Sequence, residues 1–436
     1  MGIKVTKFGG SSVADVIQIN KIKDIIESDP DRKYVVVSAP GKRFSQDSKI
    51  TDLLYSCMMQ KEHNIPYEQL FQVVCDRFTA VEVNLGVHAG LTKEFEIIKE
   101  NIDNGASADY LASRGEYLNG KLIAAFLGID FVDAADVIKF DAKGRFLEDE
   151  TNEALKAELA KHERALVPGF YGAMPDGTIK TFSRGGSDIT GALLARAVGA
   201  DVYENWTDVS GFLVADPRIV EYAKPMEYIS YNELRELSYM GASVLHEDAI
   251  YPARIANIPI NIRNTNAPED NGTMIVAEPV NAEERVITGI AGSKDFVVIA
   301  ITKHNLKSER GFIRRLAGIL EDKNITLEHM PSGIDTISVV VSNLDASDLD
   351  ELTEEFERQL QPDKMEVIED LCLIATVGEG MAYRKGVSAR LFAALAEADV
   401  NIRMIDQGSS EMNIIVGVEN KDKNTAIKAI YDAFVE

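Results

Sequence analysis

Two kinds of hydrophobic pattern alternate along the chain as far as residue 263. Short apolar runs typical of buried parallel strands, such as residues 33–38, are separated by longer stretches with helical spacing, such as residues 108–127. This order predicts an α/β fold, a three-layer αβα sandwich with a mainly parallel sheet. Ligand-binding loops gather at the carboxyl ends of parallel strands, so we expect the functional site at that edge.

The same pattern predicts where each element begins and ends. Strands are expected at residues 3–8, 33–38, 129–133, 165–168, 178–182, 202–206 and 258–263. Helices are expected at residues 13–27, 50–61, 66–84, 95–101, 108–127, 152–161 and 189–198.

The remainder of the chain contains a repeat. Residues 310–330 align with residues 385–405, an offset of 75 from 310 to 385. Strands 296–302 and 337–342 and helix 349–360 align at this offset with strands 371–377 and 412–417 and helix 424–434. We therefore expect two β-α-β-β-α modules, roughly 296–365 and 371–436, whose strands can interleave. The expected domains are residues 1–285 and 286–436.

Within the first module two further features are expected. The helical stripe Ile313, Leu316, Ala317 and Leu320 is predicted to face the core. A strand is predicted at residues 325–332, after the helix. The turn at residues 305–311 and this strand could together hold a small polar ligand.

Composition narrows the possible partners. A formal net charge of -24 argues against nucleic acids and anionic membranes, which require clustered Lys and Arg. A small anionic ligand needs only a few local cations and stays possible. Cys57, Cys75 and Cys372 are widely spaced among apolar neighbours, which indicates reduced core thiols and a cytoplasmic protein. No signal peptide or membrane span is expected.

Residues 182–191, Phe-Ser-Arg-Gly-Gly-Ser-Asp-Ile-Thr-Gly, join an expected strand to an expected helix. Such a glycine elbow points backbone N–H groups and the positive end of a helix at an anion. On its own the elbow could serve any phosphate or carboxylate.

A second turn follows the first expected strand, with the sequence Lys7-Phe8-Gly9-Gly10-Ser11-Ser12. The standard Gly-rich phosphate and dinucleotide loops are absent. Here the glycines allow close backbone approach, and Lys7 can reach a phosphate oxygen as a compact cation. The alternative is a tight turn with a surface lysine.

These two motifs, together with Thr207-Asp208-Val209 and Asp216-Pro217-Arg218, resemble those of aspartate kinases in the amino-acid-kinase superfamily. The terminal repeat resembles the paired ferredoxin-like ACT modules of that family, so the resemblance covers the whole chain. It implies ATP-dependent phosphorylation of the aspartate side chain to 4-phospho-L-aspartate, the first step toward lysine, threonine and methionine. Because the chain ends after the second repeat, we expect a monofunctional kinase.

The resemblance implies catalytic roles for Lys7 and Asp188. The attacking carboxylate is already ionised near pH 7, so no general base is required. Lys7 is expected to neutralise charge on the transferring phosphoryl group, assisted by the amides of Gly9 and Gly10. Asp188 is expected to orient Lys7 and to help organise Mg²⁺, which ATP carries and for which no direct ligand is assigned.

For aspartate itself, the resemblance implies that Arg184 binds the α-carboxylate, with Gly186 and Ser187 adding contacts. Glu116 resembles the family's acid for the α-ammonium group, whereas without the resemblance it would be an ordinary solvated helix glutamate. Thr51 matches a substrate-binding threonine. The loop before Thr51 is longer than in the family and carries Lys42, Arg43 and Lys49, which makes it a candidate lid.

The nucleotide is expected to lie across residues 206–218. The expected ATP-binding residues are Lys7, Gly9, Gly10, Ser11, Thr207, Asp208, Asp216 and Arg218. The chain departs from the family at Leu213, where Tyr is frequent, and at Ser243, where Lys is usual. The contacts with the adenine and the phosphates of ATP are therefore expected to differ at these positions. Packing roles are expected for Trp206 and His246.

In the first ACT module, the positions that align with the family's lysine-inhibitor site are Leu306, Arg310, Gly311, Phe312, Glu328 and Ser332. Glu328 suits a ligand ammonium group, and open amides at the turn suit its carboxylate. We expect feedback inhibition by lysine, alone or jointly with threonine, in a homodimer or dimer of dimers formed through the ACT modules.

Two alternatives stay open. A sibling kinase could act on glutamate, N-acetylglutamate or UMP, although Glu116, residues 184–188 and the ACT repeat favour aspartate. A non-catalytic amino-acid sensor would keep the fold without the chemistry, and the presence of Lys7 and Asp188 counts against it.

Overall fold

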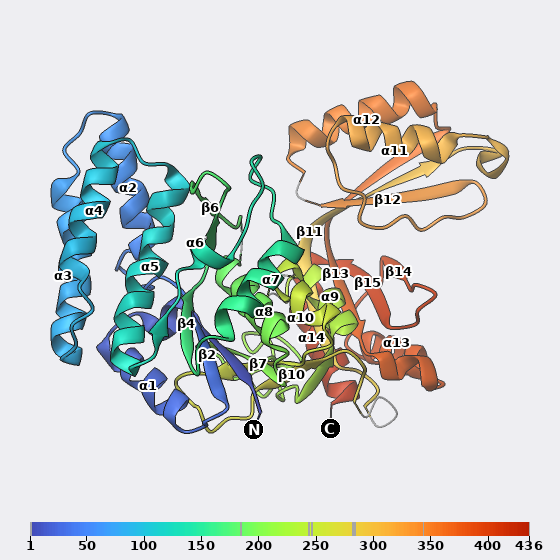
Figure 1. Cartoon of the computed structure of the whole chain (residues 1–436). Coiled ribbons are helices and arrows are strands. Elements are labelled where there is room, and N and C mark those ends of the chain that lie inside the picture. Colours follow the sequence, from blue (N-terminus) through green and yellow to red (C-terminus); the bar gives the residue numbers. More distant parts are fainter. Residues whose placement is uncertain are drawn as a thin grey trace. The chain divides into compact units, whose positions relative to one another are not determined.

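The computed structural model describes residues 2–183, 185–242, 245, 247–280, 285–342 and 344–435 (Figure 1). Its contacts divide into two compact units. The first comprises Met1–Phe212, Pro225–Tyr231 and Val244–Pro279, and the second Leu213–Lys224, Asn232–Ser243 and Val280–Glu436. Two short segments before residue 280 thus cluster with the C-terminal region. The boundary between the two expected domains, at residue 285, stays a prediction.

The first unit is built on an eight-stranded sheet. Its strands, in spatial order, are β3 (Asp130–Phe131), β4 (Ala165–Pro168), β2 (Arg32–Val37), β1 (Lys4–Phe8), β7 (Val202–Thr207), β9 (Ile260–Asn264), β10 (Thr273–Val276) and β8 (Tyr228–Ser230). All neighbours are parallel except β9 and β10. The prediction of a mainly parallel sheet is confirmed. The expected strand 178–182 is β6 (Ile179–Thr181), which pairs outside this sheet with β5 (Tyr171–Ala173).

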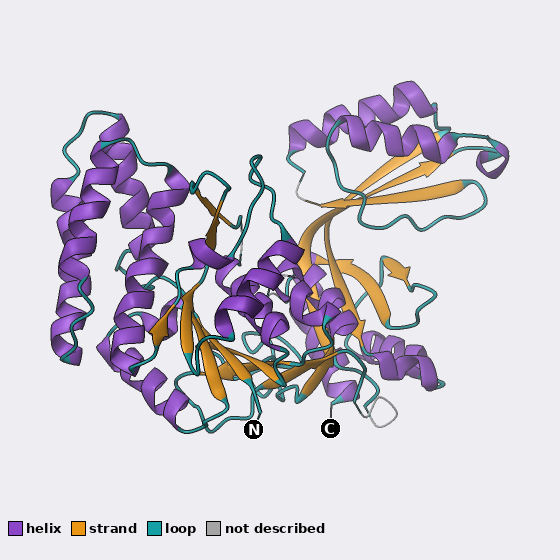
Figure 2. Ribbon diagram, viewed as in Figure 1, coloured by secondary structure: helices purple, strands orange, loops and turns teal. Residues whose placement is uncertain are grey.

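Helices cover both faces of the sheet (Figure 2). On one face, α1 (Val16–Glu27) and α5 (Ala108–Leu127) pack their isoleucines and leucines on Phe8, Val35 and Val37. On the other, α8 (Gly186–Val198) contacts β1, β2 and β7, and it packs against α7 (Glu148–Leu159) and α10 (Glu247–Ile255). Side chains alternate between faces along a strand, so Phe8 faces α1 while Lys7 faces α8.

A separate helical layer extends from the sheet. It comprises α2 (Ile50–Glu62), α3 (Glu68–Leu85) and α4 (Leu91–Asp103), which share a hydrophobic core with α5. Figure 1 shows these helices running side by side. The remaining short elements are η1 (Gly10–Val13), α6 (Ala134–Val137) and α9 (Tyr231–Tyr239). The expected helix 13–27 begins only at Val16, because Asp15 caps it by accepting from Gln18 N.

The second unit holds one five-stranded antiparallel sheet. Its order is β12 (Thr336–Ser342), β11 (Gly289–Thr302), β13 (Lys364–Val377), β15 (Asn413–Glu419) and β14 (Met404–Asp406). Residues 289–293 of β11 pair with the end of β13, and residues 298–302 pair with its beginning. These two long strands therefore contribute to both halves of the repeat.

Two helices accompany each half of the repeat. They are α11 (Phe312–Asp322) and α12 (Ala346–Leu360) in the first half, and α13 (Val387–Glu397) and α14 (Lys423–Phe434) in the second. Single 3-10 turns lie at Leu306–Ser308, Glu379–Tyr383 and Asn420–Asp422. The expected strands 296–302, 337–342, 371–377 and 412–417 correspond to β11, β12, β13 and β15, and the expected helices are present. The boundaries of the two modules stay a prediction.

Two expectations for the first module are wrong. Ile313 is 54% exposed, and the stripe that packs into the core is Phe312, Leu316, Ile319 and Leu320. Residues 325–332 form no regular strand, only isolated bridges from His329 to Val340 and from Ser332 to Ile337. Pro331 lies between them and has no N–H to donate, which interrupts the ladder.

Among the described helices, none has the length and apolar composition needed to cross a membrane.

Candidate active site

Lys7, Asp188 and Asn205 meet where β1, β7 and the start of α8 come together. The Lys7 ammonium lies 2.6 Å from Asp188 Oδ1, and Asn205 Nδ2 donates to the same oxygen at 2.8 Å. Lys7 and Asn205 are register partners in the β1–β7 pair, and both are buried. One carboxylate oxygen thus accepts a charged and a neutral donor, which fixes the direction of the lysine.

Asn205 was missed from the sequence. Its neighbours Glu204 and Trp206 point to the opposite face, where Trp206 Nε1 donates to Glu204 at 2.9 Å. Arg32 and Arg263 stack on the Trp206 ring at 5.3 and 4.7 Å. The packing role expected for Trp206 is confirmed. Side chains alternate between the two faces along a strand. If Glu204 and Trp206 face one side of the sheet, Asn205 must face the other side, and this alternation was the sequence signal for it.

The turn after β1 is held against its surroundings by backbone contacts. Gly9 N donates to Trp206 O at 3.0 Å, and Gly41 N donates to Gly10 O at 2.9 Å. A side chain on Gly10 would place its Cβ 3.1 Å from Ala39 O, so glycine is required for this approach. The Gly9 amide therefore already has an acceptor in this structure, and its contact with a phosphate stays a prediction.

The serines of this turn differ. Ser11 is exposed, whereas Ser12 is buried and shares a 2.7 Å hydrogen bond with the Thr265 hydroxyl. Of the two, Ser11 is the hydroxyl accessible to a ligand, in line with its place among the expected ATP-binding residues.

The elbow before α8 is tightly packed. Gly185 takes a left-handed φ of 59°, and a Cβ on Gly186 would lie 2.7 Å from the Phe170 ring. Phe170 itself has a φ of 84°, unusual for a bulky residue, and Thr190 supports it by accepting from Phe170 N at 3.2 Å. Ser187 is buried against Gly169. Arg184, expected to bind the α-carboxylate, lies outside the described residues.

Glu116 is 6% exposed on α5, and its Oε2 has no hydrogen-bond partner among the described residues. Burial raises the pKa of this carboxyl to about 8, with the Ala39 amide opposing the shift. A solvated helix glutamate is therefore excluded. A buried carboxylate with an unpaired oxygen is suited to bind a cationic group.

Glycine at position 115 brings Glu116 close to the loop after β2. A Cβ on Gly115 would lie 2.7 Å from Ala39 Cβ. Thr51 is half-buried in the first turn of α2, directly after this loop. The loop thus contributes to the wall around Glu116.

The candidate lid, the loop between β2 and α2, is held by contacts with α3 and by an ion pair within the loop. Arg77 of α3 donates to Ser48 O at 2.7 Å and to Gly41 O at 3.0 Å. Within the loop, Arg43 pairs with Asp47 at 2.8 Å, which holds the pKa of that carboxyl well below its usual range. Lys42 and Lys49 are exposed. Movement of this loop stays a prediction.

The expected nucleotide contacts fall in both units. Thr207 and Asp208 follow β7 in the first unit, and the Thr207 hydroxyl donates to Asp208 at 3.2 Å. Asp216 and Arg218 belong to the second unit, where Arg218 is exposed and pairs with Asp216 at 2.6 Å. This pairing lowers the pKa of Asp216. Ser243 and His246 lie outside the described residues.

At the expected effector site, Glu328 already has two partners in the second unit. Ser342 Oγ donates to one oxygen at 2.6 Å, and the Tyr239 hydroxyl of α9 donates to the other. Tyr239 was missed because 89 residues separate it from Glu328.

The other expected effector positions surround the first turn of α11. Leu306 and Phe312 are buried in the module core, Gly311 has a φ of 78°, and Arg310 and Ser332 are exposed. The side chains of Leu306 and Phe312 are thus core, and a ligand there would meet the backbone of these residues.

In the described part of the chain, no group of three or more His, Cys, Asp or Glu residues is placed to hold a metal ion. The cysteines are unpaired and buried, as expected. Burial raises the pKa of the Cys57 and Cys372 thiols to about 11 and that of Cys75 to about 12.

Comparison with known proteins gives two family matches. Residues 2–264 match the amino acid kinase family, and residues 374–434 match an ACT domain family. Aspartokinase 3 of Bacillus subtilis is 39% identical over 449 residues, which cover 99% of this chain and 98% of that protein.

Solved structures agree with these matches. The aspartate kinase of Clostridium acetobutylicum is 51% identical, with a TM-score of 0.92 and complete coverage of both chains. Aspartokinase III of Escherichia coli, in complex with aspartate and ADP, is 26% identical with a TM-score of 0.74, again with complete coverage of both. With this site and both families in order along its length, the chain belongs to the amino acid kinase family, within its aspartokinases.

Proposed function

We propose that this chain transfers the γ-phosphoryl group of ATP to the side-chain carboxylate of L-aspartate, giving 4-phospho-L-aspartate. The observation that carries the proposal is the 2.6 Å pair between Lys7 and Asp188 at the carboxyl ends of parallel strands. The related Escherichia coli structure, a complex with aspartate and ADP, supports the choice of substrates. In the cell the reaction would begin the synthesis of lysine, threonine and methionine.

Charge neutralisation is the main catalytic requirement. Aspartate attacks as a carboxylate, so Lys7 acts as the cation that offsets charge on the transferring group, and no proton acceptor is needed. Asp188 and Asn205 hold Lys7 in this direction.

Mg²⁺ is proposed to arrive with ATP and to offset phosphate charge when bound. The residues present fit this role in one respect. Both described contacts of the Asp188 side chain are to Oδ1, so Oδ2 is the oxygen suited to the metal. In the first unit the nucleotide is proposed to contact Lys7, Gly9, Gly10, Ser11, Thr207 and Asp208. The resemblance to aspartate kinases is the support for Asp216 and Arg218.

Glu116 is proposed to bind the α-ammonium group of aspartate. An arriving cation pairs with its free oxygen and restores the charged form that burial disfavours. Arg184, Gly186 and Ser187 are proposed for the α-carboxylate, and Thr51 for a further hydrogen bond.

Regulation is proposed to use the first ACT module, with lysine as the effector and its ammonium group on Glu328. Aspartokinase III of Escherichia coli has also been solved in complex with lysine and aspartate. Pairing of chains through the ACT modules is proposed from the resemblance to aspartate kinases.

A phosphorylation assay with ATP and four acceptors tests the proposal. Aspartate should be phosphorylated, with glutamate, N-acetylglutamate and UMP at least 100-fold slower in kcat/KM. Turnover of another acceptor at the aspartate rate would identify a sibling kinase. No turnover of any acceptor, together with heat from lysine binding in calorimetry, would identify a sensor.

A further inference from the structure

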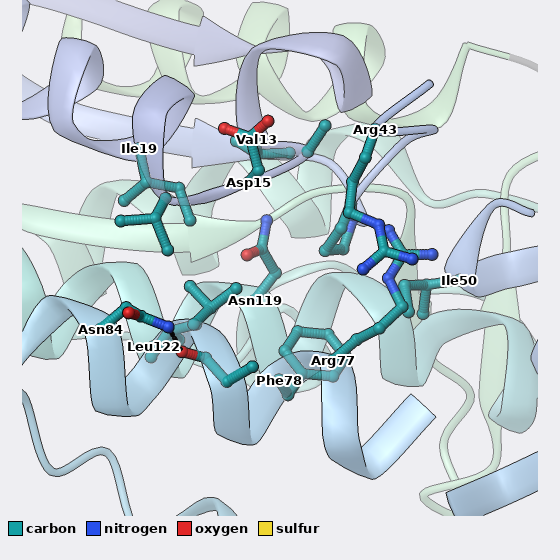
Figure 3. Close-up of a pocket in the computed structure, with 15 residues that line it drawn as sticks. Val13, Asp15, Ile19, Arg43, Ile50, Arg77, Phe78, Asn84, Asn119 and Leu122 are labelled. Carbon is teal, nitrogen blue, oxygen red and sulfur yellow. Dashed lines mark hydrogen bonds between the residues drawn. The ribbon is translucent and has the colours of Figure 1, made fainter. Parts of the chain in front are cut away.

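A cavity of about 170 Å³ lies in the first unit, behind the turn that follows β1 (Figure 3). Its walls come from η1 and α1, from the loop after β2, and from α3 and α5. The apolar part is formed by Val13, Ile19, Phe78, Val81 and Leu122. None of Lys7, Asp188 or Glu116 lines it, so it is separate from the candidate active site.

One buried acceptor in this cavity has no partner. Asn119 on α5 is 0% exposed, and its Nδ2 donates to Ser38 O at 2.7 Å. That bond fixes the orientation of the amide and leaves Oδ1 without a hydrogen bond among the described residues. Figure 3 shows the Asn119 amide projecting between Ile19 and Phe78. A buried acceptor without a donor is unfavourable, so a ligand that supplies the donor relieves part of this cost.

The charged residues around the cavity all have hydrogen-bond or ion-pair partners in the protein. Arg43 and Arg77 both lie beside Asp47, at 2.8 and 3.5 Å, and Arg77 also donates to Gly41 O and Ser48 O. Asp15, on the opposite wall, accepts from Gln18 N as the cap of α1. The two arginines and the two aspartates, Asp15 and Asp47, sum to no net formal charge, so the surroundings do not select an ion of either sign. The site therefore suits a neutral molecule.

We propose that this cavity is a binding site for a neutral aromatic or similarly sized apolar molecule that donates one N–H or O–H hydrogen bond to Asn119 Oδ1. The size is appropriate, since an apolar cavity of roughly 150 Å³ is sufficient for benzene. The inference goes beyond the proposed function and does not depend on it.

Such a ligand would contact the loop that also forms the wall around Glu116. Pro40, Arg43 and Ile50 line the cavity, and Gly41 of the same loop is bonded to the backbone of Gly10. Binding should therefore stabilise the arrangement of this loop and raise the melting temperature of the protein.

Calorimetry with two bicyclic probes tests the site on the full chain. Indole presents one N–H donor, whereas benzofuran has the same shape with an acceptor oxygen. We expect saturable binding of indole with Kd below about 1 mM, and binding of benzofuran at least tenfold weaker. Water filling the cavity, which would satisfy Asn119 without a ligand, predicts no binding of either probe and would overturn the proposal. Equal affinities would overturn the role of Asn119.

Surface variants locate the binding. Ala80 and Asn84 line the cavity from α3 and are exposed, so Ala80→Phe and Asn84→Trp should block it without removing core contacts. Thr79→Phe, at an exposed neighbour outside the lining, is the matched control. We expect at least tenfold weaker indole binding in the two blocking variants, and unchanged binding and kinase activity in the control. Folding of the variants is verified by circular dichroism. If both blocking variants bind indole as tightly as the parent protein, the binding site lies outside this cavity and the proposal is wrong.

Discussion

At the scale of single residues, Lys7 is the group on which phosphoryl transfer most depends. Its ammonium is buried and held at 2.6 Å from Asp188, so no mobile surface cation can take its place. Lys7→Met should lower kcat by about 100- to 1,000-fold, the range seen when one preorganised charge-stabilising donor is removed.

The matched control is Lys33→Met, a change of a lysine on the neighbouring strand β2. Steady-state kinetics of both variants should show loss only for Lys7. Turnover by Lys7→Met within a factor of three of the parent protein would reject the assignment.

Asn205 acts through Asp188 and is a positioning residue. Asn205→Ala removes a donor to Oδ1 and should lower kcat by about tenfold, the equivalent of one hydrogen bond, with KM for aspartate unchanged. Asn205→Asp removes the same donor and places a second carboxylate beside Asp188, so its kcat should fall further than that of Asn205→Ala. Unchanged kcat in both variants would contradict a positioning role for Asn205.

Glu116 should make aspartate use depend on pH. Its pKa of about 8 means that the carboxyl is mostly neutral at pH 7, whereas the α-ammonium group pairs with the charged form. The value of kcat/KM for aspartate should therefore rise as the pH approaches 8. Glu116→Gln should abolish this limb and raise KM, because the amide cannot take the charge.

The same group should affect stability with a definite sign. The folded pKa is raised above the ordinary value of 4.5, so the folded state holds the proton more tightly than the unfolded state. Stability from this group is complete below pH 4.5 and is lost as the pH rises through about 8. The free energy of unfolding, measured with urea at several pH values, should therefore change differently with pH in the parent protein and in Glu116→Gln between pH 4.5 and about 8. The same pH dependence in both proteins would contradict the burial of this carboxyl.

At the scale of elements, sequence patterns predicted most strands and helices because burial imposes a clear period on β2, β4, α5 and α12. Predictions failed where a local interaction outweighed periodicity. Pro331 interrupts the expected strand 325–332. In α11, Leu316 and Leu320 face the core as expected, but Phe312 and Ile319 complete the buried stripe in place of Ile313 and Ala317. Asn205 and Tyr239 could not be assigned roles, since their partners come from strand register and from an element far along the chain.

The approach of α5 to the loop after β2 depends on Gly115. Gly115→Ala would place a Cβ 2.7 Å from Ala39 Cβ and 3.3 Å from Ile50, so the helix or the loop must move. We expect a loss of about 1–3 kcal/mol in unfolding free energy, together with a higher KM for aspartate. Gly318→Ala, where no atom lies within 4 Å, is the control and should be stabilising by about 0.5–1 kcal/mol. Equal effects of the two changes would contradict a close contact at Gly115.

At the scale of the whole molecule, regulation must join the ACT modules to the kinase chemistry, and α9 provides a covalent route. Residues 232–243 cluster with the second unit, while the segments before and after them belong to the first. Within the second unit, Glu233 accepts from Thr288 and from Glu379 N, and Glu236 accepts from Asn413. A ligand that changes the contacts of α9 would thus act on a segment continuous with both units.

Tyr239 offers a direct test of this connection. Its hydroxyl occupies Glu328, the carboxylate proposed for the effector ammonium group, so effector and tyrosine compete for the same oxygens. Tyr239→Phe removes the competitor and should lower the lysine concentration for half-maximal inhibition by about three- to tenfold, since one hydrogen bond to a charged group is replaced. Glu328→Gln should abolish the response. Tyr251→Phe, a change at an exposed tyrosine of the first unit, is the control for loss of a hydroxyl. If Tyr239→Phe responds to lysine as the parent protein does while Glu328→Gln does not respond, the effector reaches Glu328 without displacing α9, and inhibition must pass through the ACT modules by another element.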